Sequence, residues 1–191
     1  MPSGSDTATV LVVDDEQEVA DVYALRLHDE YDTRVAYGGE DALETIDVDV
    51  DIVLLDRRMP DISGDEVLAE IRGKGYNCRV IMLTAVDPGL DIVDMPFDDY
   101  LCKPVEKEDL VAAIDQQLRI HRYDDRLSEY FEISSKVALL EAELPSQELE
   151  DSEELARLRD RAETLRAEID ETLDEFDDID QAFQDIGRYP G

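Results

Sequence analysis

Five short apolar runs, rich in β-branched residues, alternate with amphipathic stretches between residues 8 and 118. This alternation constrains the fold most, because strands separated by helices form a parallel sheet with helices on both faces. The runs cover residues 8–13, 33–37, 51–56, 79–84 and 99–102. The third and fourth are apolar at consecutive positions, which is typical of central strands covered on both sides. We therefore expect an α/β fold with a doubly wound, five-stranded parallel sheet.

The stretches between these runs predict five helices. We place them at residues 16–29, 39–47, 64–73, 88–95 (a short helix) and 105–118. Glycine and proline mark several of their ends. Gly64 opens the third helix and Gly73 closes it, and Pro104 supplies a backbone angle suited to the start of the last one.

Residues 119–186 contain no strand pattern and no glycine, and helix-forming residues dominate them. Pro145-Ser146 interrupts the helical pattern. We therefore expect an all-α helical hairpin, with arms at residues 119–143 and 148–186.

Both arms carry apolar residues at heptad spacing. The second arm has Leu155, Ala162, Ile169, Phe176 and Phe183 at one position and Leu158, Leu165, Thr172 and Ile179 at the other. The first arm has Tyr123, Tyr130, Val137 and Leu144, beside Leu127, Ile133 and Leu140. Two such stripes predict helices packed as a coiled coil, within one chain or between two chains.

Polar residues follow the predicted strands at their carboxyl ends, where parallel sheets place ligand sites. They are Asp14-Asp15-Glu16, Asp56, Thr84 and Lys103-Pro104. Carboxylates that converge there repel one another unless a cation lies among them, and oxygen ligands suit Mg²⁺. Lys103 adds a positive charge for a phosphoryl oxygen and Thr84 a hydroxyl, while Asp56 is placed as the nucleophile. The set predicts phosphoryl transfer.

Each of these residues also has a structural interpretation. Asp14 and Asp15 could cap a helix, Asp56 could be a turn residue, and Lys103 could be a solvated lysine. Their joint occurrence at successive strand ends favours the functional interpretation. Gly64 stands eight residues after Asp56, and proline directly follows Lys103.

With these motifs, residues 8–118 resemble the receiver domain of two-component response regulators, which has a flavodoxin-like fold. The resemblance implies that Asp56 accepts a phosphoryl group from a phosphohistidine of a sensor histidine kinase. It also implies that Asp15 binds Mg²⁺ directly and Asp14 chiefly through water, with Asp56 and the backbone carbonyl of Arg58 as further ligands. Such a protein is not an enzyme but a phosphoacceptor that takes part in its own phosphorylation and in slow autodephosphorylation.

The resemblance assigns roles to three further positions. Lys103 pairs with the phosphoryl group, and its peptide bond to Pro104 is expected to be cis. Thr84 and Tyr100 occupy the switch positions, where the threonine moves toward the phosphoryl oxygen and the aromatic ring turns inward. Phosphorylation then shifts an existing two-state equilibrium.

The sequence departs from this family between Thr84 and Tyr100. The connection is shorter than usual and contains Pro88 and Pro96, so its helix must be brief or distorted. In this family the face of the domain that carries this connection normally transmits the signal. The sequence therefore leaves open how this chain transmits it.

Residues 119–186 resemble the HalX-type helical domain found behind receivers in salt-loving archaea. The leading interpretation of residues 119–191 is an output domain that associates through its apolar stripes, as a homodimer or with an unknown protein effector. The alternative is a DNA-binding transcriptional regulator, and a third interpretation is a scaffold without phosphorylation. DNA binding would need a basic surface, whereas the arginines at 157–166 are interspersed with acids, which favours ion pairs within the helix.

The chain has 51 acidic and 18 basic residues, a formal net charge of -33, and both halves contribute to it. In molar salt the Debye length falls to about 3 Å, which screens the repulsion. We expect a salt-adapted, halophilic protein; the alternative is an acidic surface that steers a basic partner. No apolar run approaches the length of a membrane span and no secretion signal is visible, so we expect a cytoplasmic protein with a disordered N-terminus at residues 1–7.

Overall fold

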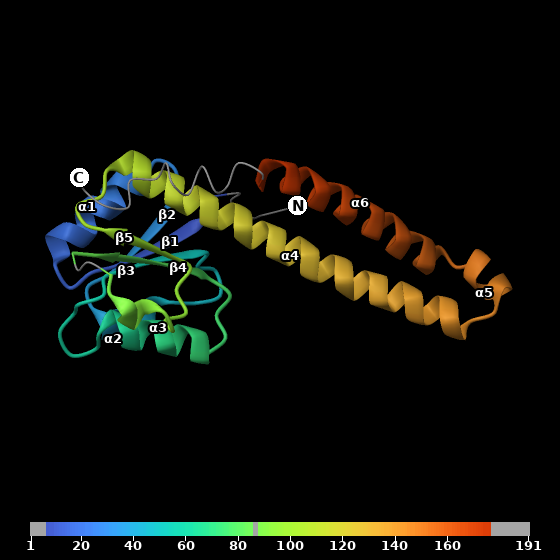
Figure 1. Cartoon of the computed structure of the whole chain (residues 1–191), viewed down its shortest axis with the longest axis horizontal. Helices are drawn as coiled ribbons and strands as arrows, with labels where there is room; N and C mark the ends of the chain where they lie inside the picture. Colours follow the sequence, from blue (N-terminus) through green and yellow to red (C-terminus); the bar gives the residue numbers. More distant parts are fainter. Residues whose placement is uncertain (1–6, 86–87, 177–191) are drawn as a thin grey trace. The chain divides into compact units, whose positions relative to one another are not determined.

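The computed structural model describes residues 7–85 and 88–176 of the chain. These residues form two compact units, which divide between Leu118 and Arg119. Figure 1 labels the elements of both units. The expectation for residues 1–7 falls outside the described residues except at Thr7, which is exposed.

The first unit contains the predicted five-stranded parallel sheet, and the structure gives its strand order as β2-β1-β3-β4-β5. Its strands are β1 (Thr9–Val13), β2 (Asp32–Ala36), β3 (Ile52–Leu55), β4 (Arg79–Thr84) and β5 (Asp99–Cys102). Its helices are α1 (Gln17–Leu27), α2 (Gly39–Thr45), α3 (Gly64–Gly73) and the first part of α4, which starts at Lys107. This is the flavodoxin-like, doubly wound fold.

The sheet lies between two layers of helices (Figure 1), and apolar side chains fill the interface on each face. The side chains of α1 and the start of α4 pack on one face, while those of α2 and α3 pack on the other. Successive residues of a strand point to opposite faces, so Leu54 joins the first layer and Leu55 the second. Both faces are covered, which explains why the central strands are apolar at every position.

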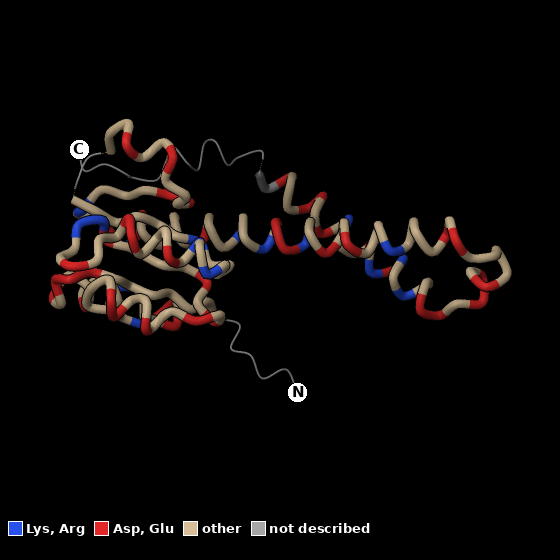
Figure 2. Tube along the Cα trace, turned by 90° about the horizontal axis from the view of Figure 1, so that it is seen from below, with Lys and Arg blue, Asp and Glu red and all other residues tan. Residues whose placement is uncertain are grey.

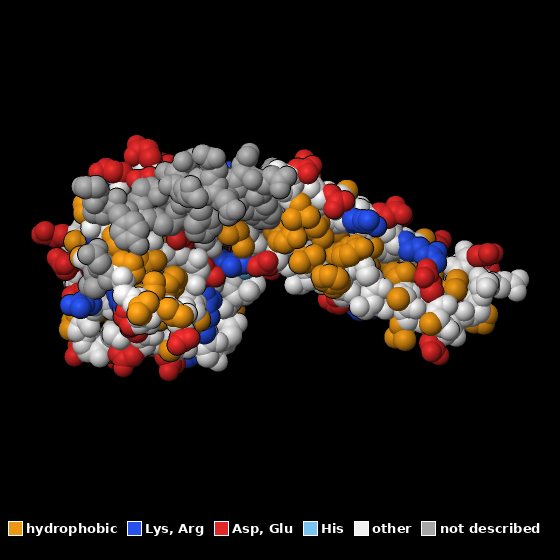
Figure 3. Space-filling model, in the orientation of Figure 1, with side chains coloured by type: hydrophobic (Ala, Val, Ile, Leu, Met, Phe, Trp, Pro, Cys, Tyr) orange, Lys and Arg blue, Asp and Glu red, His pale blue; other side chains and the backbone are white. Residues whose placement is uncertain are grey.

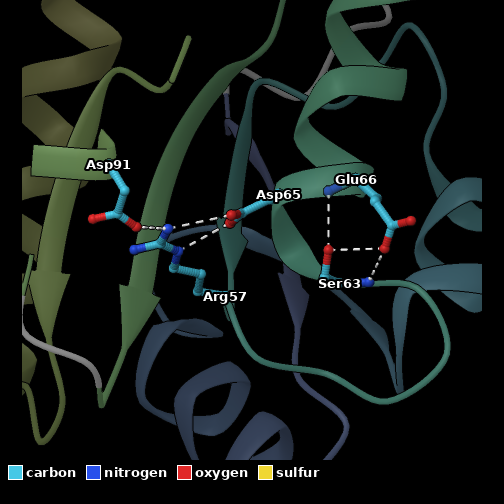
Figure 4. Close-up of polar contacts among 5 residues, drawn as sticks. All are labelled: Arg57, Ser63, Asp65, Glu66 and Asp91. Atoms are coloured by element: carbon cyan, nitrogen blue, oxygen red, sulfur yellow. Dashed lines mark hydrogen bonds and ion pairs between the residues drawn. The ribbon is translucent and has the colours of Figure 1, made fainter. Parts of the chain in front are cut away.

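Helix α3 begins at a capping box. The Ser63 hydroxyl accepts a hydrogen bond from the Glu66 amide at 3.3 Å, and the Glu66 carboxylate accepts one from the Ser63 amide at 2.8 Å. These two contacts satisfy amides that would otherwise lack partners in the first turn. The loop that follows β3 therefore ends at a fixed point, visible in Figure 4.

Among its described residues, 85 and 88–98, the connection between β4 and β5 contains only a three-residue 3₁₀ turn, η1 (Leu90–Ile92). This confirms the expectation of a brief or distorted helix. Leu90 is 91% exposed and Val93 is 73% exposed, so η1 presents apolar side chains to solvent.

Two helix boundaries differ from the sequence prediction. The helix expected at 105–118 and the arm expected at 119–143 are one continuous helix, α4 (Lys107–Glu143), because no glycine or proline separates them. The second arm was expected as one helix from 148, but it comprises α5 (Ser146–Glu150) and α6 (Glu153–Phe176). The Ser152 hydroxyl accepts a hydrogen bond from the Leu155 amide at 3.2 Å and so caps a new helix. Residues 177–186 of the predicted arm lie outside the described residues.

In the second unit α4 packs on α6 through the predicted apolar stripes. Ile133 of α4 is buried, and the buried residues of α6 are Leu155, Leu165, Ile169 and Thr172. The stripes therefore meet within one chain, which is one of the two predicted alternatives. Ile179, Phe183 and the side chain of Phe176 lie outside the described residues. Figure 3 shows further apolar side chains on the surface of this hairpin. Phe131 and Leu139 are among its exposed apolar residues.

Ion pairs join the two helices of the hairpin, contrary to the expectation of pairs within one helix. Arg161 contacts Glu129 at 2.8 Å, and Arg159 contacts Glu141 at 2.5 Å. The prediction was wrong for both arginines because the partner helix brings carboxylates closer than the next turn does. Arg157 contacts an acid of its own helix, Glu154, at 3.9 Å.

Acidic residues occur along every part of the described chain rather than at one place (Figure 2). This distribution agrees with a solvated acidic coat more than with a single docking patch. Among the described helices, none is long and apolar enough to cross a membrane.

Candidate functional site

The carboxyl ends of β1, β3 and β5 bring Asp14, Asp56 and Lys103 together. Asp56 directly follows β3, and its amide donates to the Val13 carbonyl at 2.9 Å. The Asp14 amide donates to the Ala36 carbonyl at 3.2 Å. Both aspartates are buried, with Asp56 only 7% exposed. The sheet itself therefore fixes the main chain of the site.

Three carboxylates converge at this edge of the sheet. One oxygen each of Asp14, Asp15 and Asp56 lies within 4.8 Å of the others. Asp14 Oδ1 accepts a hydrogen bond from the Glu16 amide, two residues along the chain, at 2.9 Å. An all-oxygen cluster of this size fits the hard, oxygen-preferring Mg²⁺ ion.

The Lys103 ammonium lies between two of these carboxylates. It forms an ion pair with Asp14 and lies 3.3 Å from Asp56 Oδ1. Burial opposes the charge of Lys103, but the contacts with Asp14 and Asp56 outweigh it and raise the pKa of the ammonium. The Lys103–Pro104 peptide bond is cis, which confirms the expectation.

Burial raises the pKa of Asp56 to about 6. Lys103 favours the charged carboxylate and lowers this pKa, whereas the neighbouring Asp14 and Asp15 raise it. The net shift means that the fold holds Asp56 in an environment that disfavours its charge. A cation bound beside Asp56 would stabilise its charged form.

Thr84 and Tyr100 lie on the two strands beside the site. Thr84 ends β4, is buried, and accepts a hydrogen bond at its carbonyl from the Lys103 amide at 2.8 Å. The Tyr100 ring is buried on β5 and packs on Phe97, with ring centroids 5.6 Å apart. Arg58 is exposed, and the role of its carbonyl as a metal ligand stays a prediction.

Gly64 packs against the main chain behind Asp56. Its amide donates to the Arg57 carbonyl at 2.8 Å. A Cβ atom at position 64 would lie 2.2 Å from the Asp56 carbonyl oxygen, closer than any stable contact. The sequence marked Gly64 as the opening of a helix, eight residues after Asp56, and the structure shows that it sets the close approach of α3 to the nucleophile.

Sequence reasoning gave no role to Arg57, the residue after the nucleophile. Figure 4 shows its guanidinium between Asp65 of α3 and Asp91 of η1. Arg57 Nε lies 3.0 Å from Asp65 Oδ1, and a terminal nitrogen pairs with Asp91. The contacts with Asp65 and then Asp91 raise the pKa of Arg57 despite partial burial. No spacing in the sequence links residues 57 and 91, so this contact became visible only with the folded connection.

The sequence matches the family described as response regulator receiver domain over residues 10–115. The chain belongs to this family. Residues 119–186 of this receiver protein match the HalX domain, as the resemblance predicted. Both assignments agree with the two compact units of the structure.

Solved receiver structures share the fold of the first unit. A response regulator receiver domain from Clostridium thermocellum is 28% identical with a TM-score of 0.55; the match covers 60% of this chain and 97% of that one. The response regulator TrrA from Thermotoga maritima is 31% identical with a TM-score of 0.50, covering 58% of this chain and 98% of that one. The TrrA structure is a complex with Mg²⁺ and a beryllium fluoride.

A longer relative comes from Haloferax volcanii and bears the name of a transcriptional regulator. It is 42% identical, and the match covers 94% of this chain but 32% of the relative. This response regulator thus spans about a third of the length of that protein.

Proposed function

We propose that Asp56 accepts a phosphoryl group from a sensor histidine kinase and that this modification switches the HalX unit. The observation that carries the proposal is the buried Asp56 carboxylate, which lies among Asp14, Asp15 and Lys103 at the carboxyl edge of the sheet. We propose the boundaries 8–118 for the receiver and 119–191 for the output domain.

In the proposed reaction a carboxylate oxygen of Asp56 attacks the phosphorus of the phosphohistidine. The new oxygen–phosphorus bond forms as the bond to the imidazole nitrogen breaks, and the imidazole leaves with the electron pair. Lys103 neutralises one phosphoryl oxygen, and the Thr84 hydroxyl donates to another. Such transfer depends mainly on positioning and on charge neutralisation.

Asp14, Asp15, Asp56 and the carbonyl of Arg58 would hold a Mg²⁺ ion. When bound, the ion supplies positive charge that neutralises the carboxylates and the incoming phosphoryl group. The Lys103 ammonium, which now contacts both Asp14 and Asp56, would then pair with the phosphoryl group instead.

Thr84 and Tyr100 are the proposed switch residues. A phosphoryl group on Asp56 offers the Thr84 hydroxyl a charge-assisted hydrogen bond that exists in only one arrangement of the β4 end. The phosphorylated site therefore favours that arrangement over the alternative one.

For the output unit we propose association of two chains through the exposed side of the α4–α6 hairpin. Phe131 and Leu139 are exposed there, although the hairpin has already buried its central stripe. The second candidate is a DNA-binding regulator, which the name of the Haloferax volcanii relative favours. Sedimentation velocity in molar KCl with Mg²⁺, with and without beryllofluoride, tests association, and retention on duplex DNA in the same buffer tests the second candidate.

Fluorine NMR of beryllofluoride binding tests the acceptor assignment. In Mg²⁺ and molar KCl we expect protein-bound fluoride signals for the wild-type chain and none for Asp56→Asn. Asp61→Asn is the matched control, because Asp61 is an exposed residue of the same loop. Bound signals that persist in Asp56→Asn would refute the assignment.

A further inference from the structure

Arg57 joins two separate parts of the receiver unit, α3 and η1, by ion pairs (Figure 4). Two of its nitrogens donate to the Asp65 carboxylate of α3, at 3.0 and 3.3 Å. One of these nitrogens also pairs with Asp91 of η1, and the guanidinium interacts with the Tyr100 hydroxyl of β5, which lowers the pKa of that hydroxyl against the effect of burial. The Arg57 side chain is only 12% exposed, so solvent screens these contacts less than it screens surface ion pairs.

This contact set is rigidly connected to the acceptor residue. Arg57 directly follows Asp56, and its carbonyl is held by the Gly64 amide at 2.8 Å. The close approach of Gly64 leaves no room for the main chain of residues 56 and 57 to move toward α3. The guanidinium therefore extends from a fixed point beside the nucleophile to the β4–β5 connection.

Over its described residues 88–95 the segment that contains η1 has few other polar attachments, and Arg72 of α3 holds the residue that follows it by donating to the Pro96 carbonyl at 3.0 Å. The amides of Ile92 and Val93 bond only to carbonyls of the same segment, each at 3.3 Å. Ile92 and Met95 are partly buried against the core, whereas Leu90 and Val93 face solvent. Among the described residues 88–95, Asp91 is the one whose side chain forms an ion pair with another element. The docking of this segment thus depends strongly on Arg57.

We propose that Arg57 is a positioning residue that couples the docking of the η1 segment to the buried position of the Tyr100 ring, and through the ring to phosphorylation of Asp56. The link from the Tyr100 ring to phosphorylation of Asp56 rests on the proposed function. The links of Arg57 to the η1 segment and to the Tyr100 ring do not. With Asp91 in place, the guanidinium is held where it can donate to the Tyr100 hydroxyl. Without Asp91 the guanidinium pairs with Asp65 alone, so the buried position of the Tyr100 ring and the docked position of η1 are both less stable.

Coupling of this kind is reciprocal. Whatever favours the buried Tyr100 ring also favours the docked η1 segment, with its Leu90 and Val93 side chains presented on the surface. Among its described residues the β4–β5 connection contains one 3₁₀ turn, η1, and the Arg57–Asp91 pair thereby supplies a route from the acceptor to the surface of this turn.

Asp91→Asn tests the proposal, because it removes the charge at nearly constant size. Asp94→Asn is the matched control, since Asp94 is an exposed aspartate of the same segment. The first readout is the fluorine NMR signal of fluorotyrosine at position 100, assigned by its loss in Tyr100→Phe and recorded without beryllofluoride. The second is the beryllofluoride concentration at half-saturation in Mg²⁺ and molar KCl.

We expect Asp91→Asn to shift or broaden the position-100 signal and to weaken beryllofluoride binding roughly two- to fivefold. Asp94→Asn should change neither, and Asp91→Glu should restore part of both. An unchanged position-100 signal in Asp91→Asn, or a changed signal with unaltered beryllofluoride binding, overturns the coupling. If the wild-type chain binds no beryllofluoride, the proposed function fails, while the tyrosine signal alone still decides whether Asp91 and the ring are coupled.

Discussion

Replacing Asp56 by asparagine should stabilise the fold in the absence of divalent ions. Burial raises the pKa of Asp56 to about 6, against an ordinary value of 3.8. The difference of roughly two units corresponds to about 3 kcal/mol of unfolding free energy at a pH above both values. Asparagine keeps the shape and removes the charge, so it should recover about 1–3 kcal/mol of this cost.

The sign of the pH dependence follows from the direction of the shift. Between pH 3.8 and about 6 the folded chain binds more protons at Asp56 than the unfolded chain does. The stability of the wild-type protein should therefore fall as pH rises through this window, relative to that of Asp56→Asn. Below the window the two proteins should differ little, and above it the difference should be constant.

Urea unfolding followed by tyrosine fluorescence measures this difference, in molar KCl with a chelator at pH values from about 4 to 8. Asp61→Asn serves as the control, because Asp61 is exposed in the same loop and asparagine tolerates its positive φ of 65°. Equal stability of wild type and Asp56→Asn at pH 7.5, or a difference independent of pH, would refute the reasoning. Added Mg²⁺ should narrow the difference by stabilising the wild-type chain alone.

Three further perturbations test other parts of the structure. Gly64→Ala should slow phosphoryl uptake and lower stability, because its Cβ atom would lie 2.2 Å from the Asp56 carbonyl oxygen. Gly73→Ala should do neither, because no neighbouring atom lies within 4 Å of a Cβ atom at that position. Equal uptake rates in the two variants would contradict the packing argument. Leu165→Ala, at a fully buried position, should lower the free energy of urea unfolding by about 2–5 kcal/mol. Leu139→Ala, at a position that is 63% exposed, should change this free energy little. Similar losses of unfolding free energy in the two variants would show that the hairpin does not pack as described. Dilution from molar to about 0.1 M KCl should lower the melting temperature as the Debye length grows to about 10 Å, and an unchanged melting temperature would contradict salt adaptation.

The strands and the acceptor cluster could be predicted because local patterns determine them. Val10, Ile52 and Ile81 stand in short apolar runs, and the residues after such runs meet at one edge of a parallel sheet. Asp14, Asp56 and Lys103 therefore came together as expected, without any knowledge of the loops.

Contacts between distant segments could not be predicted in the same way. The Arg57–Asp91 pair depends on how the shortened β4–β5 connection folds back, which no periodicity encodes. The pairing of Arg161 with Glu129 depends on the register of α4 against α6. No helix-breaking residue stands at Leu118 or Arg119, so the sequence did carry a signal for a continuous α4; the prediction divided the helix there because the pattern of the sequence changes at this boundary.

Chemical trapping of the acyl phosphate tests the central claim most directly. The protein is incubated with a small phosphoryl donor in Mg²⁺ and molar KCl, reduced with borohydride, digested, and mapped by mass spectrometry. We predict reduction of one side chain, Asp56, only when both donor and Mg²⁺ are present. Modification at another aspartate, or none in a chain that is folded and binds Mg²⁺, would contradict the assignment of Asp56 as the phosphoryl acceptor.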